Sequence, residues 1–230
     1  MSKIKVMLSA AFKPAYLELV PQFEKATGHH VISLWVPSVQ IMSRLIGGEK
    51  VDLVILSAAA IEALVSQGIV RSADRVDLAT SGIGLAVRAG APQPDISSGE
   101  ALRRAVLAAS SIVYSTGPSG VYLAGLFERM GIAAEIERKV KKVQGEPAGA
   151  VVARGDAEIG FQQMSELLPV AGIDVVGPLP PDVQEITMFS AGVHAQADEP
   201  HAARALVDFF TAPAAAAVIE RSGMQPACRV

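Results

Sequence analysis

Two spacings of apolar residues alternate along the chain. Short apolar runs predict strands, at 4–9, 31–36, 52–57, 82–88, 111–115, 139–143, 157–161, 174–176 and 186–193. Between them, apolar residues recur every three or four positions and predict helices at 13–27, 38–47, 59–67, 99–108, 119–130, 146–154, 163–168 and 200–222. Strands separated by helices are typical of an α/β fold, in which helices cover both faces of a mostly parallel sheet.

Two extended segments predict crossings between two lobes. Residues 79–90 are punctuated by glycine and too apolar for a linker, and residues 186–193 have the same character. A chain that leaves one lobe along the first segment and returns along the second forms a discontinuous lobe. We therefore expect lobe 1 at residues 1–82 plus 192–230 and lobe 2 at 83–191. The ligand would bind in a cleft between them that closes about a hinge.

Composition narrows the class of partner. The chain has 230 residues, of which 50% are hydrophobic and 5% aromatic, enough for a large aliphatic core. The formal net charge is −3 and there is no basic block, so nothing favours nucleic acid as a partner. Since no apolar stretch approaches ~20 residues, we expect no membrane insertion.

Cysteine, histidine and the N-terminus offer little chemistry. The single cysteine, Cys228, permits no internal disulfide and is expected to be incidental. The four histidines have no metal-binding spacing and there is no nucleotide-binding motif, so we expect neither metal nor cofactor. Residues 1–3 lead directly into a strand with no signal peptide. The chain is therefore expected to be cytoplasmic as written, or periplasmic if it is a trimmed mature form.

The strongest chemical signal is a set of strand-to-helix junctions rich in small and hydroxyl residues, at 4–14, 33–39 and 112–122. The first amides of a helix lack intrahelical partners and lie at the positive end of its dipole. Several such ends in one cleft would bind an anion. A serine at a helix start can equally be a simple cap. The candidate ligand-binding residues at these junctions are Ser9, Ala10, Ala11, Phe12, Ser38, Ser115, Thr116, Ser119 and Gly120, and Ser57 at the end of the strand 52–57 is a further candidate.

The order of these segments resembles that of a known family. The stretches that carry the resemblance are 6–11, 21–28, 51–58, 149–160 and 209–216, which together span nearly the whole chain. They are similar to type II periplasmic solute-binding proteins, and within these to the molybdate-binding proteins of ABC transporters. The resemblance implies a two-lobed α/β fold that binds a small-molecule anion, with an ABC permease as partner only if a leader has been removed.

The molybdate site itself is only partly kept. In that family two serine hydroxyls, backbone amides and a tyrosine hold the oxyanion. Ser38 stands at the second serine position, but the first falls on Ala11, unless Ser9 substitutes from the same turn. The expected amide falls on Pro147, which has no N–H, and the tyrosine falls on Gln163. Each missing donor removes ~1–3 kcal/mol, which argues against molybdate.

A second branch of the family matches better. Residues 158–169 and 176–180 resemble proteins that lack the molybdate site, among them aconitate isomerase, which interconverts cis- and trans-aconitate by an allylic proton shift. This resemblance implies a di- or tricarboxylate ligand. Gln162 and Gln163 would suit it, because amide side chains both donate and accept.

Three further residues complete the candidate site. Lys13, at the start of the first helix, could bind a carboxylate or simply be solvated, and Tyr122 could face the cleft or pack beneath it. Glu146 is the candidate carboxylate for proton transfer, or else an ordinary loop acid. Lys13 and Glu146 are thus the predicted catalytic residues of an isomerase. The alternative is a solute-binding component of an ABC transporter for molybdate or another oxyanion.

Overall fold

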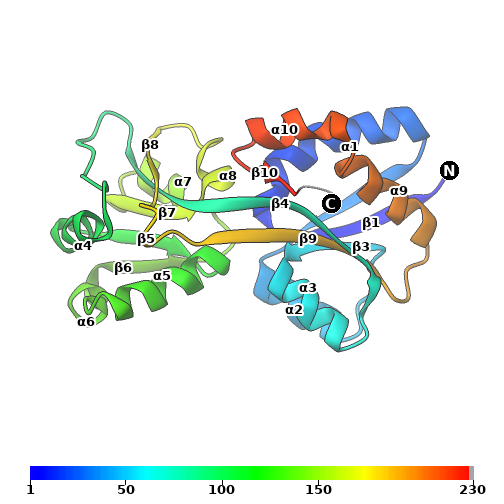
Figure 1. The fold of residues 1–230 in the computed structure, drawn as a ribbon, viewed down its shortest axis with the longest axis horizontal. Helices are drawn as coiled ribbons and strands as arrows, with labels where there is room; N and C mark the ends of the chain where they lie inside the picture. Colours follow the sequence, from blue (N-terminus) through cyan, green and yellow to red (C-terminus); the bar gives the residue numbers. More distant parts are fainter. Residues whose placement is uncertain (228–230) are drawn as a thin grey trace. The chain divides into compact units, whose positions relative to one another are not determined.

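The computed structural model describes residues 1–227 and is a mixed α/β structure (Figure 1). Cys228 lies outside the described residues. The strands are β1 (Lys3–Leu8), β2 (His30–Trp35), β3 (Leu53–Ser57), β4 (Val70–Arg88), β5 (Ile112–Ser115), β6 (Val140–Val143), β7 (Ile159–Gln163), β8 (Ile173–Pro178), β9 (Ile186–His194) and β10 (Gln225–Pro226). The helices are η1 (Ala10–Phe12), α1 (Lys13–Thr27), α2 (Ser38–Ile46), α3 (Ala58–Ser66), α4 (Gly99–Ala108), α5 (Pro118–Arg129), α6 (Ala133–Ile136), η2 (Glu137–Lys139), α7 (Ala148–Ala153), α8 (Met164–Leu167), α9 (Pro200–Phe210), η3 (Pro213–Ala215) and α10 (Ala216–Arg221).

The alternation of strands and helices predicted from the sequence is confirmed, with two corrections. The strand predicted at 82–88 is wrong at its start, because β4 begins at Val70. Its first half is rich in charged residues, which hid it, and these charges are paired in the fold. Arg204 Nε lies 2.7 Å from Asp74 Oδ1, and Arg75 Nη2 lies 3.1 Å from Asp77 Oδ1.

The helix predicted at 200–222 is also wrong, since the segment contains α9, η3 and α10 in succession. The break falls at Thr211–Ala212, directly before Pro213. Proline has no N–H to continue the helix and disfavours helical backbone at the residue before it. Within residues 1–227 no single helix is long and apolar enough to cross a membrane. The two helical segments Pro200–Phe210 and Pro213–Arg221, bent by 57° where they join, are together long and apolar enough to do so, by length and composition only.

The chain forms two compact units. One contains Met1–Ser81 and the chain from Thr187 onward, and the other contains Gly82–Ile186. The sequence-based boundaries fall nearby, at 82/83 and 191/192. The chain passes from the first unit to the second along β4 and returns at the start of β9.

The first unit is built on a parallel sheet. β1 lies between β2 and β3 and pairs parallel with both, and β9 pairs antiparallel with β3. One apolar cluster joins this sheet to α1, α9 and α10 through residues such as Phe12, Phe23 and Phe210. A second cluster on α2 and α3 includes Ile41 and Leu64. Helices therefore cover the sheet with two separate cores, as continuous apolar strands require.

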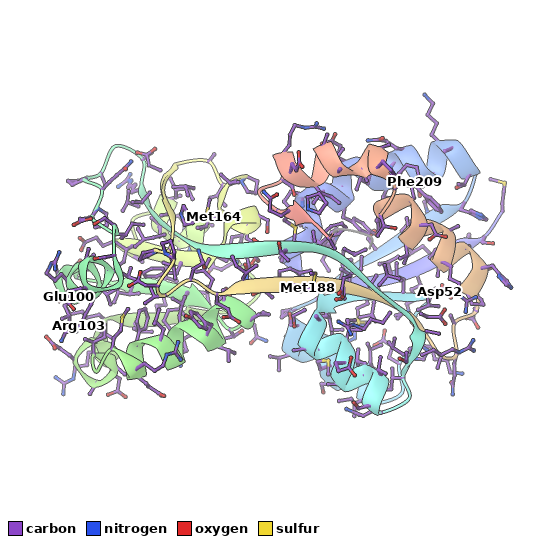
Figure 2. All side chains as sticks on the ribbon, viewed as in Figure 1. Asp52, Glu100, Arg103, Met164, Met188 and Phe209 are labelled. Carbon is purple, nitrogen blue, oxygen red and sulfur yellow. The ribbon has the colours of Figure 1, made fainter. Side chains whose placement is uncertain are left out.

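A buried carboxylate fastens the two ends of this discontinuous unit together. Asp52, labelled in Figure 2, is 4% exposed and accepts the backbone N–H of Lys5 at 2.8 Å. Its other oxygen accepts the N–H of Glu199, the residue before α9, also at 2.8 Å. Two charge-assisted bonds thus connect the first strand to the beginning of a C-terminal helix.

The second unit has its own sheet and core. β5 pairs parallel with β6 and β7, and β7 pairs antiparallel with the second half of β4. Met164 of α8 (Figure 2) packs against Gly84 of β4, where any Cβ would collide with its sulfur. In both units, parallel pairing brings the carboxyl ends of the strands to one edge of the sheet.

A glycine sets how closely α5 approaches β5. A Cβ at Gly120, in the first turn of α5, would collide with the backbone carbonyl of Ser115, the last residue of β5. Because the obstacle is backbone, no side-chain rotation relieves it. Gly120 thus permits the tight turn that was predicted to bind an anion.

We expect Gly120→Ala to destabilise the protein by about 3 kcal/mol, because the helix must move away from the strand. The matched control is Gly125→Ala in the same helix, whose new Cβ meets only the flexible end of Arg129 at 3.3 Å. That variant should be stabilised by roughly 0.5–1 kcal/mol. Urea unfolding of both proteins tests this, and equal midpoints would contradict it.

Candidate functional site

Three predicted serines lie at one edge of the first unit's sheet. Ser9 follows β1, Ser38 begins α2 three residues after β2 ends at Trp35, and Ser57 ends β3. Leu8 pairs with Trp35 and with Ile55, which places the three strand ends side by side. The edge is fixed by backbone bonds as well: the N–H of Ser9 donates to the carbonyl of Ile55 at 3.3 Å.

The hydroxyls of these serines are not used to cap helices. Ser9 is the N-cap of η1 and Ser57 the N-cap of α3, and neither side chain bonds to its helix. Ser38 follows Pro37, the N-cap of α2, and this helix also has no side-chain cap. Ser98 shows the contrast, because its Oγ accepts the N–H of Ala101 at 3.2 Å and so caps α4.

The rest of the first turn offers mainly backbone. Ala10 is exposed, whereas Ala11 and Phe12 are 4% and 1% exposed and belong to the core. The ring of Phe12 packs edge-on against Phe210, with centroids 5.5 Å apart. Contacts from Ala11 and Phe12 to a ligand would therefore come from main-chain atoms.

Lys13 adds a positive charge to the same edge. It is exposed at the start of α1, and its Nζ lies 5.0 Å from the centroid of the Trp35 ring, within cation–π range. Within residues 1–227 no carboxylate forms an ion pair with this ammonium. The edge thus combines neutral donors with one cation.

In the second unit the junction after β5 is tightly bonded. The Oγ of Ser115 accepts the N–H of Gly117 at 3.3 Å, and the N–H of Thr116 donates to Val143 at 3.0 Å. Ser119 is 1% exposed. Gly120 provides the close approach described above.

Two predicted residues are engaged away from this junction. The hydroxyl of Tyr122 donates to the carbonyl of Val183 at 3.0 Å, which matches the packing alternative for this side chain. The carboxylate of Glu146 forms an ion pair with Arg154 at 3.0 Å and is 41% exposed. Arg154 also pairs with Asp156, at 3.1 Å, so Glu146 belongs to a surface cluster of charges.

Gln162 forms a buried bridge. It is 3% exposed, and its Oε1 accepts the N–H of Ala148 at 2.7 Å. Its Nε2 donates to Glu166 Oε1 at 2.8 Å. Both ends of the amide therefore bind within the second unit, and the first N–H after Pro147 is occupied. Gln163, the N-cap of α8, is 1% exposed.

Glu166 is the residue that sequence reasoning missed. Burial raises the pKa of its carboxyl to about 7, although hydrogen bonds from Gln162 and from the backbone of Gln163 oppose the shift. Its place three residues after the N-cap Gln163 is the acid position of a capping box, which is readable in the sequence. The bond from Gln162 and the raised pKa are not.

The structure groups the predicted residues within each unit. Ser9, Ser38, Ser57 and Lys13 share the edge of the first unit's sheet. The residues after β5, β6 and β7 share the corresponding edge of the second. A hollow of about 640 Å³ in the second unit, lined by residues such as Tyr114, Phe127 and Lys142, contains none of them. Among the described residues, no group of three or more His, Cys, Asp or Glu could hold a metal.

Comparison with known proteins identifies relatives of the whole chain. It is 41% identical over 229 residues to an aconitate isomerase from Pseudomonas sp., an alignment that covers 97% of this chain and 87% of that protein. It is 27% identical over 232 residues to the molybdate-binding protein ModA of Azotobacter vinelandii, covering 96% and 89%.

Solved structures show the same fold. The periplasmic molybdate-binding protein of Azotobacter vinelandii superposes with a TM-score of 0.81 at 19% identity, covering 99% of this chain and 100% of that one. The model of a bacterial extracellular solute-binding protein family matches residues 4–225. The resemblance seen in the sequence and the type II two-lobed α/β fold are confirmed, and the chain belongs to the bacterial extracellular solute-binding protein family.

Proposed function

We propose that this protein binds a small di- or tricarboxylate and isomerises it by an allylic proton shift, as an aconitate isomerase does. The observation that carries the proposal is the 41% identity to an aconitate isomerase over nearly the whole chain. The identity to ModA over a similar length is 27%.

The distribution of donors supports an organic anion over a tetrahedral oxyanion. Ala11 has no hydroxyl at the first serine position that the family resemblance implies. Pro147 has no N–H, and the next amide, that of Ala148, already donates to Gln162. Unreplaced donors weaken binding of a buried oxyanion. A carboxylate, by contrast, is well served by Lys13 and the uncapped serine hydroxyls.

The reaction needs one base and a site for negative charge. The base removes a proton from the methylene carbon of the substrate, and the electron pair delocalises over three carbons and the attached carboxylates. The double bond shifts, and a proton returns at the other end of the three-carbon unit. Lys13 and the amides at helix starts would stabilise the charge that develops on the carboxylates.

Two carboxyls of the second unit compete for the role of base. Glu146 is the choice from sequence, but it is half exposed and paired with Arg154. Glu166 has a pKa of about 7, where a general base is most effective at neutral pH. We assign the proton transfer to Glu166 and treat Glu146 as the competing assignment.

The alternative function is that of a solute-binding component of an ABC transporter for molybdate or another oxyanion. The relationship to ModA and the shared fold with a molybdate-binding protein support it. An ABC permease would then be the partner and the periplasm the compartment.

The two functions predict different responses to ligands. We expect cis-aconitate to raise the unfolding temperature, since it binds only the folded protein, and its ultraviolet absorbance to change with time as it is converted. Molybdate should do neither. Stabilisation by molybdate with no response to carboxylates would overturn the proposal in favour of the transporter component.

Glu166→Gln should lower kcat by roughly 10²–10⁴-fold, because the amide keeps the shape but cannot accept the proton. In the unsubstituted protein kcat should rise with pH and level off above about 7, as Glu166 ionises. The control is Glu146→Gln, which removes the exposed carboxylate and should leave kcat within a few-fold. The opposite ranking of the two variants would return the role to Glu146.

The same carboxyl should make stability depend on pH. Its pKa in the folded protein is raised above the ordinary 4.5 to about 7, so the folded state binds more protons than the unfolded state between these values. This contribution to stability is therefore lost as pH rises through that interval. The melting temperature of Glu166→Gln minus that of the unsubstituted protein should therefore increase from pH 5 to pH 8. Parallel pH profiles would refute the assignment.

A further inference from the structure

The single tryptophan lies beside the predicted ligand-binding edge. Trp35 is the last residue of β2, is 37% exposed, and is the only tryptophan in the chain. Its partner in the sheet is Leu8, the residue before Ser9. The N–H of the next residue, Val36, donates to Leu8 at 3.2 Å. The indole is thus fixed next to the turn that opens the first unit's site.

The orientation of Trp35 is set by a buried neighbour. The ring of Tyr16, one turn along α1 from Lys13, meets the indole edge-on with centroids 5.3 Å apart and planes at 82°. Tyr16 is 1% exposed, and its hydroxyl hydrogen-bonds to Ser33 Oγ at 2.7 Å. Burial raises the pKa of Tyr16 to about 12, so this support stays neutral. The Trp35 indole therefore packs against a buried and neutral tyrosine, which fixes its orientation.

The Trp35 ring in turn restricts the flexible side chain of Lys13. The Lys13 ammonium lies 5.0 Å from the indole centroid, and within the described part of the chain it has no carboxylate partner. A ring face attracts a cation but does not neutralise it. The Lys13 ammonium is therefore held beside the ring, and its N–H groups that point away from the ring remain available to an anion.

We propose that Trp35 is a positioning residue for Lys13, and that the two form a subsite for one carboxylate of the ligand. The inference rests on the proposed function, since it names the group that recognises the substrate. Lys13 contacts the carboxylate, whereas Trp35 acts through Lys13. An anion with a second or third carboxylate would gain from this subsite, but a compact tetrahedral oxyanion bound by neutral donors would not.

The test is a double-mutant cycle on ligand affinity. The probe is propane-1,2,3-tricarboxylate, a saturated analogue that cannot undergo the allylic shift, measured by calorimetry. Trp35→Leu should weaken binding roughly 2- to 30-fold, the range expected for loss of a cation–π contact. Trp35→Phe keeps a ring face and should retain most of the affinity. In the Lys13→Met protein, Trp35→Leu should have no further effect.

A merely structural tryptophan would behave differently, because Trp35→Leu would then weaken binding equally with or without Lys13. That result overturns the inference and leaves the proposed function intact. If the unsubstituted protein does not bind the tricarboxylate, both fail. If Trp35→Leu does not fold, Trp35→Phe replaces it in the cycle, because Trp35 is partly exposed and Phe keeps an aromatic ring there. Trp35→Phe should then lower the affinity slightly in the protein that has Lys13 and not at all in Lys13→Met.

Fluorescence provides a second readout that needs no substitution at the tryptophan. As the sole indole, Trp35 should report the ligand through a saturable change in emission whose midpoint equals the calorimetric Kd. The amplitude should collapse in Lys13→Met measured at saturating ligand. An emission that is unchanged while calorimetry shows binding would contradict a subsite at Trp35.

Discussion

Parallel pairing of short buried strands is the constraint on which the rest of this structure depends. Each parallel neighbour requires the chain to return to the same side, so the carboxyl ends of the parallel strands lie at one edge of each sheet, where the following helices begin. The predicted site residues follow from this arrangement. Serines at 9, 38 and 57 share one edge of the sheet because β1, β2 and β3 pair in parallel, not because they are close in sequence.

The proposed preference for a carboxylate over an oxyanion rests on the way the polar groups of the two units are used. The amide of Ala148 donates to Gln162, and the side-chain amide of Gln162 donates to Glu166. These donors of the second unit are therefore already used within the fold. In the first unit, Ser9 and Ser57 occupy cap positions without capping, and Lys13 rests on an aromatic ring. Under the proposed function, specificity would arise from the polar groups that make no hydrogen bond or ion pair within the fold.

Much of this could be predicted from sequence, because apolar periodicity reports burial directly. The strand ends and the turns at Ser9, Ser38 and Ser115 fall where the pattern placed them. The first half of β4 was not predicted because it is rich in charged residues, and one of them, Asp74, pairs with Arg204 far along the chain. Gln162, Glu166 and Trp35 show the same limit of sequence-based prediction. The sequence gives their residue types, but their hydrogen-bond and ring partners, and the raised pKa of Glu166, depend on how separate segments pack.

The bonds from Asp52 to Lys5 and Glu199 also bear on how the protein is made. The first unit lacks β9 and the α9 side of its core until the last part of the chain has been synthesised. The second unit's sheet is formed by the second half of β4 together with β5, β6, β7 and β8, all within residues 82–186. During translation the second unit can thus complete its sheet first. Until α9 and α10 are made, the apolar residues that they cover in the finished fold lack these partners, and uncovered apolar surface favours aggregation.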